Sequence, residues 1–458
     1  MKSIKFLSLL IPGVPLTFSC EVTKAENDIQ KKPNIVVIMA DDLATNELSC
    51  YGGKNVKTTN IDRLANEGIL LGNNYASATM SVPIRASLYT GLYPARHGSF
   101  QNHKTSYSNI KSVTHYLPDI GYRVGRTGKQ HTTPKSVYDF EEIPGFEVNC
   151  VSSTANYSTD GIEEFIERDN KPFCLFVCSI HPHAPWTWGN PEEIDADKIV
   201  LPPNTVDNAI TRNLFRNYLA EVKALDEEVG AVLQVLEKTN TLDNTLVIFL
   251  GEQGPQFPFG KWTCYRYGQN SAFIARYPHK IKSKTTSDAL VQYEDILPTL
   301  IDFGGGEAVD DIDGRSFLKV LYGEHDDHRN WTYGIHNNIP EGTAYPIRSI
   351  QDKRYKLIIN LTPDVDYFEK HLMNVKNKRS AWASWLESAK TSVVAKELTE
   401  RYMKRPAVEF YDLKNDPWEM NNLADNKEYA SRISVMKSEL EKWMAQQGDK
   451  GVAMDIEF

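Results

Sequence analysis

The sequence has few cysteines, no excess of basic residues and no long hydrophobic run, and each absence excludes a class of protein. Six cysteines among 458 residues, five of them beyond Cys20, form an odd and sparse set rather than a disulfide framework. Lysine and arginine number 51 against 60 aspartate and glutamate, a net charge of -9, so no basic field exists to hold a nucleic acid. Any anionic substrate must be bound locally. Hydrophobic residues at 41% exclude fibrous and wholly disordered chains.

The amino terminus carries an apolar stretch over residues 6–18, preceded by Lys2 and Lys5. It is shorter than the roughly 20 helical residues that a bilayer requires, so residues 1–20 are interpreted as a signal peptide. Residues 16–20 loosely resemble a bacterial lipoprotein cleavage box, which would make Cys20 the lipidated first residue; plain secretion is the alternative. The protein is expected in the periplasm or at the cell surface, touching a membrane only through a lipid at Cys20.

Buried strands alternate with amphipathic helices along the first part of the chain. Apolar, β-branched runs predict strands covered on both faces at residues 33–39, 173–180, 245–250 and 271–275. Helices are expected over residues 61–67, capped by Asn60, and 212–238. This alternation predicts an α/β fold with a large, doubly wound, mixed but mostly parallel sheet.

The character of the sequence changes after Gly323. Residues 354–359 read as a strand and residues 428–446 as a helix, with an irregular polar segment between them. We expect a catalytic α/β domain over residues 30–324 and a smaller C-terminal α+β subdomain over residues 325–458.

Carboxylates follow two of the predicted strands, where open α/β sheets bind ligands. Asp41 and Asp42 follow the first strand, and Glu252 and Gln253 follow residues 245–250. Adjacent carboxylates repel each other unless a cation or a shared proton relieves the repulsion. Four oxygen donors suit calcium or magnesium rather than zinc. By themselves such pairs are more often helix caps or solvated turns.

Residues 80–91 favour the metal interpretation. Ser81, Pro83 and Arg85, followed by a short helix and Thr90-Gly91, resemble the signature of the type I sulfatases, the formylglycine-dependent family of the alkaline phosphatase superfamily. Read alone, the segment would be an ordinary helix start with Ser81 as cap. The resemblance implies that Ser81 is oxidised to formylglycine by a maturase of the anaerobic radical type.

Further segments resemble the family in order and extend over essentially the whole mature chain. They are residues 125–131, 181–185, 260–262, 291–304, 313–317 and 409–423. Residues 255–261 and 345–361 are similar to the N-sulfoglucosamine sulfohydrolase, or sulfamidase, branch. Glu252 and Gln253 depart from the family, which usually has Asp followed by Asn or His; each is one methylene longer with the same donor atoms.

The resemblance implies a role for each matched residue. Asp41, Asp42, Glu252, Gln253 and the modified Ser81 would hold the metal, and Arg85, Lys129 and Lys261 would clamp the sulfate. His183 would protonate the leaving group, and His131 would take the proton that lets sulfate leave. His181 is interpreted as a neighbour of His183. Sugar contacts are expected from His336, Arg348 and Trp186 or Trp188.

The expected activity is that of a sulfohydrolase acting on a sulfated sugar of the glycosaminoglycan type, with N-sulfoglucosamine of heparin or heparan as the favoured substrate. Three alternatives stay open: an O-sulfatase acting on another glycan, a phosphomonoester or phosphodiester hydrolase of the same superfamily, and a retired glycan-binding homologue. Ser81 together with Glu252-Gln253 is the best sequence support for the last of these.

Overall fold

The computed structural model describes residues 1, 32–152, 156–377 and 380–457, and Lys32–Phe458 form one compact unit. The predicted signal peptide and Cys20 lie outside the described residues, so export and lipidation stay predictions. Within the described part of the chain, no helix combines the length and the apolar character needed to cross a membrane.

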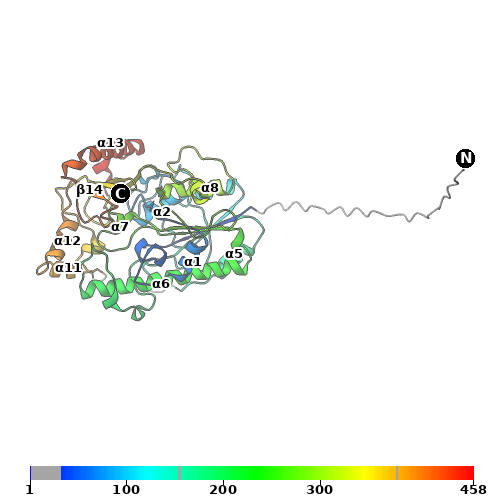
Figure 1. Cartoon of the computed structure of the whole chain (residues 1–458), viewed down its shortest axis with the longest axis horizontal. Coiled ribbons are helices and arrows are strands. Elements are labelled where there is room, and N and C mark those ends of the chain that lie inside the picture. The colour runs from blue at the N-terminus through cyan, green and yellow to red at the C-terminus, as the bar shows by residue number, and fades with distance from the viewer. Residues whose placement is uncertain (2–31, 153–155, 378–379, 458) are drawn as a thin grey trace. The chain divides into compact units, whose positions relative to one another are not determined.

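An eight-stranded sheet lies between layers of helices (Figure 1). Its strands are β1 Asn34–Met39, β2 Ile69–Leu71, β4 Arg123–Gly128, β5 Glu141–Glu142, β6 Phe173–Cys178, β7 Thr245–Leu250, β8 Phe273–Arg276 and β9 Thr285–Ser287. They are ordered β5-β4-β6-β1-β7-β8-β2-β9, and only β8 runs antiparallel to its neighbours. The predicted mixed, mostly parallel sheet is confirmed.

Helices cover both faces of this sheet. They are α1 Thr59–Glu67, α2 Ser81–Thr90, α3 Pro94–His97, α4 Val113–Asp119, α5 Asp160–Glu167, α6 Ala209–Lys238, α7 Arg266–Gln269, α8 Ile296–Phe303 and α9 Leu318–Leu321. Alternate residues of β1 enter different cores, Val37 with α2, α4 and α8, and Val36 with α1, α5 and α6. Figure 1 shows α1, α5 and α6 on one side of the sheet and α2 and α8 on the other.

Two helices begin earlier than the sequence predicts. Asn60 is not a cap but lies inside α1, where its backbone N–H and that of Ile61 donate to the Asp226 carboxylate of α6, at 3.0 and 2.9 Å. At the start of α6, the Asn208 side chain accepts from Thr211 N at 2.9 Å. The cap of α1 thus comes from a distant helix, which a local sequence pattern does not reveal.

A second, antiparallel sheet of four strands occupies the C-terminal part. Its strands are β11 Thr332–His336, β12 Ile347–Gln351, β13 Tyr355–Asn360 and β14 Val408–Asp412; β3 Asn74–Tyr75 and β10 Val291–Gln292 form a separate pair. Nearby helices are α10 Lys370–Met373, α11 Trp382–Ser388, α12 Val393–Met403 and α13 Ala430–Gln447. The predicted strand and final helix are confirmed to within two residues. The domain boundary after residue 324 stays a prediction.

Candidate active site

The carboxyl ends of four parallel strands bring the predicted residues to one edge of the main sheet. Asp41 follows β1, Lys129 follows β4, His183 follows β6 and Glu252 follows β7. Ser81 joins them as the first residue of α2. Parallel strands end at the same edge, so segments far apart in the sequence meet there.

Three buried carboxylates form the centre of the site. Oxygens of Asp41, Asp42 and Glu252 lie within 4.8 Å of one another, and all three side chains are fully buried. Gln253 Nε2 donates to Asp42 Oδ1 at 2.6 Å and to Glu252 Oε2 at 2.8 Å. Gln253 Oε1 is buried without a hydrogen-bond partner among the described residues. Clustered carboxylates with a spare amide oxygen are donors that a hard cation prefers, so the residues fit calcium or magnesium.

Three cations surround these carboxylates. Lys129 Nζ lies 2.5 Å from Asp41 Oδ2, Lys261 Nζ lies 2.7 Å from Asp42 Oδ2, and the Arg85 guanidinium pairs with Glu252. Burial opposes their charge, but the neighbouring carboxylates outweigh it and raise the pKa of Lys129, Lys261 and Arg85. All three are therefore charged at neutral pH.

Ser81 points into this charged cluster. Its Oγ donates to Glu252 Oε2 at 2.8 Å and accepts from Lys129 Nζ at 3.1 Å. Only 2% of the residue is exposed, and it lines a pocket of about 420 Å³. The pocket lining includes Ser81, His131, His183 and Lys261 together with Asn102, His103, Cys150, Trp262, Glu341 and His371.

The two predicted catalytic histidines both line this pocket. The His183 ring bonds through Nδ1 to the Ala184 carbonyl at 2.6 Å, and its Nε2 lies 3.6 Å from Asp42 Oδ2. Burial, reinforced by Lys261, lowers the pKa of His183 to about 3. Burial and then Lys129 lower that of His131 as well. His131 (φ 53°) and Asp42 (φ 60°) adopt left-handed backbone conformations, which are uncommon outside glycine and concentrate at functional sites.

His181 lies behind the pocket rather than in it. It is 2% exposed, and its two ring nitrogens face Glu221 at 3.1 Å and Glu228 at 3.8 Å, both on α6. Although burial opposes the charge, these carboxylates raise the pKa of His181. His181 is therefore a structural neighbour of His183.

The structure does not bring His336 and Arg348 to this pocket, contrary to the prediction. Both are fully buried: His336 pairs with Ile347 and Arg348 with Ile335, so the two side chains leave opposite faces of the C-terminal sheet, and both faces are covered. Arg348 Nη2 donates to Asp449 Oδ1 at 2.8 Å. Trp186 is also a packing residue, stacked on Phe257 with ring centroids 4.8 Å apart.

We expect Arg348→Ala to destabilise the fold rather than to weaken sugar binding. The change leaves the fully buried Asp449 without its partner, a loss of about 3–5 kcal/mol. Arg168→Ala is the matched control, because Arg168 and its partner Glu141 are both about half exposed and this pair should matter little. Thermal unfolding compares the two variants. A normal melting temperature combined with a raised KM for the sugar would place Arg348 among the substrate contacts after all.

Sequence reasoning missed one wall of the pocket, which comes from the C-terminal segment. Glu341 is 1% exposed and accepts from Asn102 Nδ2 at 2.5 Å and from His371 Nε2 at 2.7 Å. The His371 ring stacks on Trp262 with centroids 5.3 Å apart. Glu341 lies in a turn between β11 and β12, and His371 lies in the short helix α10; neither segment carries a local sequence signal of function.

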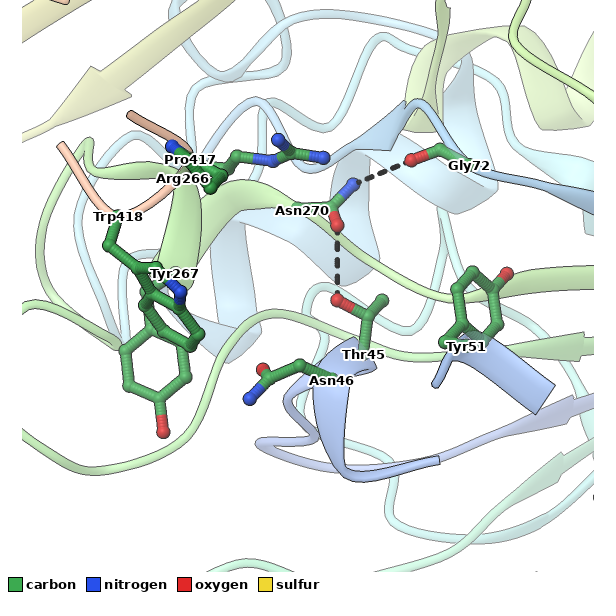
Figure 2. A pocket seen from close by; sticks show the side chains of 9 residues that line it. All are labelled: Thr45, Asn46, Tyr51, Gly72, Arg266, Tyr267, Asn270, Pro417 and Trp418. Carbon is green, nitrogen blue, oxygen red and sulfur yellow. Dashed lines mark hydrogen bonds between the residues drawn. The ribbon is translucent and has the colours of Figure 1, made fainter. Parts of the chain in front are cut away.

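A second pocket, of about 320 Å³, lies beside the strand ends near α7 (Figure 2). Its described lining contains none of the predicted catalytic or metal residues. Asn270 accepts from Thr45 Oγ1 at 3.0 Å and donates to the Gly72 carbonyl at 3.3 Å, while Trp418 lies against Tyr267. These contacts tie loops together, whereas the predicted residues Ser81, His131, His183 and Lys261 line the other pocket.

Comparison with known proteins agrees with this geometry. A family model described as Sulfatase matches residues 33–306. The chain belongs to the sulfatase family. A second model, described as N-sulphoglucosamine sulphohydrolase, C-terminal, matches residues 254–407 and confirms the resemblance to that branch. This sulfatase is therefore a hydrolase of sulfate esters or sulfamates.

Individual relatives cover nearly all of the sulfatase. An ulvan-active sulfatase of Formosa agariphila is 33% identical over 430 residues, covering 92% of this chain and 82% of its own. The N-sulphoglucosamine sulphohydrolase of Homo sapiens is 26% identical over 478 residues, covering 92% and 91%. A solved structure of BT4656 in complex with its substrate D-glucosamine-2-N,6-O-disulfate matches with a TM-score of 0.71 and 25% identity, covering 92% of this chain and 99% of the other.

Proposed function

We propose that this sulfatase removes the N-linked sulfate from a terminal glucosamine of a glycosaminoglycan fragment, using a formylglycine made from Ser81 and a bound calcium ion. The observation that carries the proposal is that Ser81 lines a pocket and its hydroxyl hydrogen-bonds Glu252 and Lys129. The sulfamidase-type C-terminal match and the relative solved with a disulfated glucosamine support the substrate class.

Asp41, Asp42, Glu252 and Gln253, with the modified residue 81, would hold the calcium, and magnesium is the second choice. When bound, the cation lowers the pKa of a hydroxyl on residue 81 and so supplies a nucleophile. The three carboxylates are already balanced by Arg85, Lys129 and Lys261. A divalent ion therefore adds surplus positive charge, which favours an anionic sulfate group.

The chain also has donors ready for the sulfate oxygens. Arg85 Nη2 is buried without a hydrogen-bond partner among the described residues, and Lys261 lines the pocket. Such fixed donors in a site shielded from water stabilise developing negative charge without reorganising. We assign Arg85, Lys129 and Lys261 to the sulfate clamp.

His183 is proposed as the general acid. The contact of its Nδ1 with the Ala184 carbonyl fixes the ring, and Nε2 is left free of hydrogen-bond partners among the described residues. At rest the ring is neutral, because burial lowers its pKa to about 3. A sulfated substrate brings negative charge close to the ring, which raises that pKa and favours a proton at Nε2. His131 is proposed to take the proton that lets sulfate leave residue 81.

Glu341 and His371 replace His336 and Arg348 as the proposed sugar contacts. Both line the pocket, and Glu341 offers carboxylate oxygens that accept from sugar hydroxyl or amino groups. His103 and Trp262 extend the same wall. The C-terminal segment would therefore select the sugar, while the strand ends grip the sulfate.

A second candidate is an O-sulfatase acting on another sulfated polysaccharide. The relative that is 33% identical to this chain is an ulvan-active sulfatase. All of these substrates need the same sulfate clamp and nucleophile. Enzymes for different sugars would therefore differ only in the residues that contact the sugar. The phosphoester and glycan-binding alternatives have no comparable support.

A panel of defined disaccharides tests the proposal. Protein coexpressed with a maturase should show a loss of two hydrogens in the peptide that carries Ser81, detectable by mass spectrometry. This enzyme should release sulfate from N-sulfated glucosamine and not from 2-O-, 3-O-, 4-O- or 6-O-sulfated sugars. Release only from O-sulfated sugars would overturn the substrate, and release from none of them, with formylglycine present, would overturn the proposed function.

Exhaustive chelation of the same enzyme tests the metal. Activity should disappear and the melting temperature should fall, because a cation that binds only the folded state stabilises it by mass action. Returning calcium should restore both. If neither changes on chelation, the carboxylate cluster is not a metal site.

A further inference from the structure

A second group of metal-ligating side chains lies beside the carboxylate cluster and has a different chemistry. One ligand atom each from Asp41, Cys150 and His183 lies within 4.8 Å of the others. Cys150 and His183 line the catalytic pocket, so an ion in solution can reach them. The proposed calcium site does not use Cys150.

The turn over residues 149–152 holds Cys150 in this position. Ser152 N donates to the Asn149 carbonyl at 2.9 Å, and Val151 N donates to Asn149 Oδ1 at 3.2 Å. The thiol is one of five free cysteines in the described chain, and its partners Asp41 and His183 follow β1 and β6 rather than coming from its own loop. Asp41, Cys150 and His183 are thus brought together by the tertiary fold and not by their positions in the sequence.

The donor set selects a different class of cation from the one that the carboxylates select. Sulfur, imidazole nitrogen and a carboxylate oxygen suit Zn²⁺ and similar thiophilic ions, which take three protein ligands and leave one position open. Calcium takes oxygen ligands and does not use a thiol. Metal-binding histidines usually donate one ring N–H to a carbonyl or carboxylate, which orients the ring. His183 has this arrangement, because its Nδ1 contacts the Ala184 carbonyl at 2.6 Å and leaves Nε2 as the ligand.

We propose that Asp41, Cys150 and His183 form a binding site for a thiophilic divalent cation, Zn²⁺ or Cd²⁺, that blocks the catalytic pocket. Binding forms a sulfur–metal bond and releases the thiol proton to water, with no change in oxidation state. The site goes beyond the proposed function, and only its inhibitory effect depends on that function.

Two consequences follow from the residues that the sites share. A metal on His183 occupies the nitrogen proposed to protonate the leaving group, so the site inhibits. Asp41 belongs to both clusters and also pairs with Lys129 at 2.5 Å. A thiophilic ion must therefore compete with Lys129 and with calcium for the same carboxylate, and excess calcium should weaken its binding.

Cadmium titration of untagged, unmatured protein tests the site without substrate and without formylglycine. A thiolate-to-cadmium absorption band should grow to one equivalent in the wild type and be missing in Cys150→Ser. That variant should also bind Zn²⁺ at least about tenfold more weakly, the lower end of what the loss of even a supporting contact costs. Cys50→Ser is the matched control, because Cys50 is another free, half-buried cysteine, and it should behave as wild type.

A measurement on the unaltered chain guards against a misfolded variant. Zn²⁺ should slow maleimide labelling of Cys150, read by peptide mass spectrometry, whereas equal concentrations of Ca²⁺ should not. The site is overturned if Cys150→Ser binds Zn²⁺ and Cd²⁺ as the wild type does, or if Zn²⁺ leaves labelling of Cys150 unchanged. Because this test measures binding alone, its failure would leave the proposed sulfatase function untouched.

Discussion

Replacing Ser81 by Ala should abolish sulfate release, by at least about 10⁴-fold, because the proposed nucleophile is made from this side chain. The melting temperature should fall by only a few degrees, since losing one hydroxyl costs about 1–2 kcal/mol. Glu252, which accepts from Ser81 Oγ, keeps its contacts with Arg85 and Gln253. Sulfate release from matured protein and thermal unfolding measure the two effects.

Ser87→Ala is the matched control for this prediction. Ser87 lies on the same helix, is equally buried and places its Oγ 3.2 Å from His97 Nε2, away from the carboxylates. The Ser87→Ala variant should lose about as much stability as Ser81→Ala and keep its activity. An active Ser81→Ala enzyme would contradict the assignment of the nucleophile, and an inactive Ser87→Ala enzyme would show that packing of α2, rather than chemistry at Ser81, is being measured.

The sequence predicted the centre of the fold well because burial on both faces leaves a continuous apolar run. Residues 33–39 and 245–250 became β1 and β7 to within a residue, and the polar residues after them met at one edge. The start of α1 was missed because its cap, Asp226, comes from α6. Local sequence patterns reflect interactions between residues close in the sequence, whereas the hydrogen bond from Asn60 to Asp226 joins residues far apart in it.

The sugar side of the pocket could not be predicted for a related reason. Neither β11 nor β12 was predicted from the sequence, and a polar residue in a strand can face either solvent or another layer, which the sequence does not reveal. Arg348 faces inward because Asp449, beyond α13, balances its charge there. Glu341 lies in a turn and His371 in the four-residue helix α10, segments too short to show a periodic pattern, and only the folded chain brings them into the pocket that Ser81 lines.

His183→Ala should slow hydrolysis of N-sulfated glucosamine by roughly 10² to 10⁴-fold, the usual contribution of a general acid. A departing nitrogen must be protonated, because an amide anion is a very poor leaving group. An activated aryl sulfate releases a phenolate that needs little protonation, so the same variant should cleave it almost normally. The measurement is the ratio of kcat/KM for the two substrates, with enzyme matured to the same extent.

His131→Ala provides the contrast that gives this ratio its meaning. Both histidines line the same pocket, and burial lowers the pKa of both, so either variant removes a partly buried neutral ring. His131 is proposed to act after the leaving group has departed, a step that is the same for every substrate. His131→Ala should therefore lower kcat to a similar slow value with both substrates and change kcat/KM little, whereas His183→Ala should separate the two kcat/KM values. Equal losses on both substrates with His183→Ala would mean that His183 positions the sulfate or Asp42 and does not protonate the leaving group.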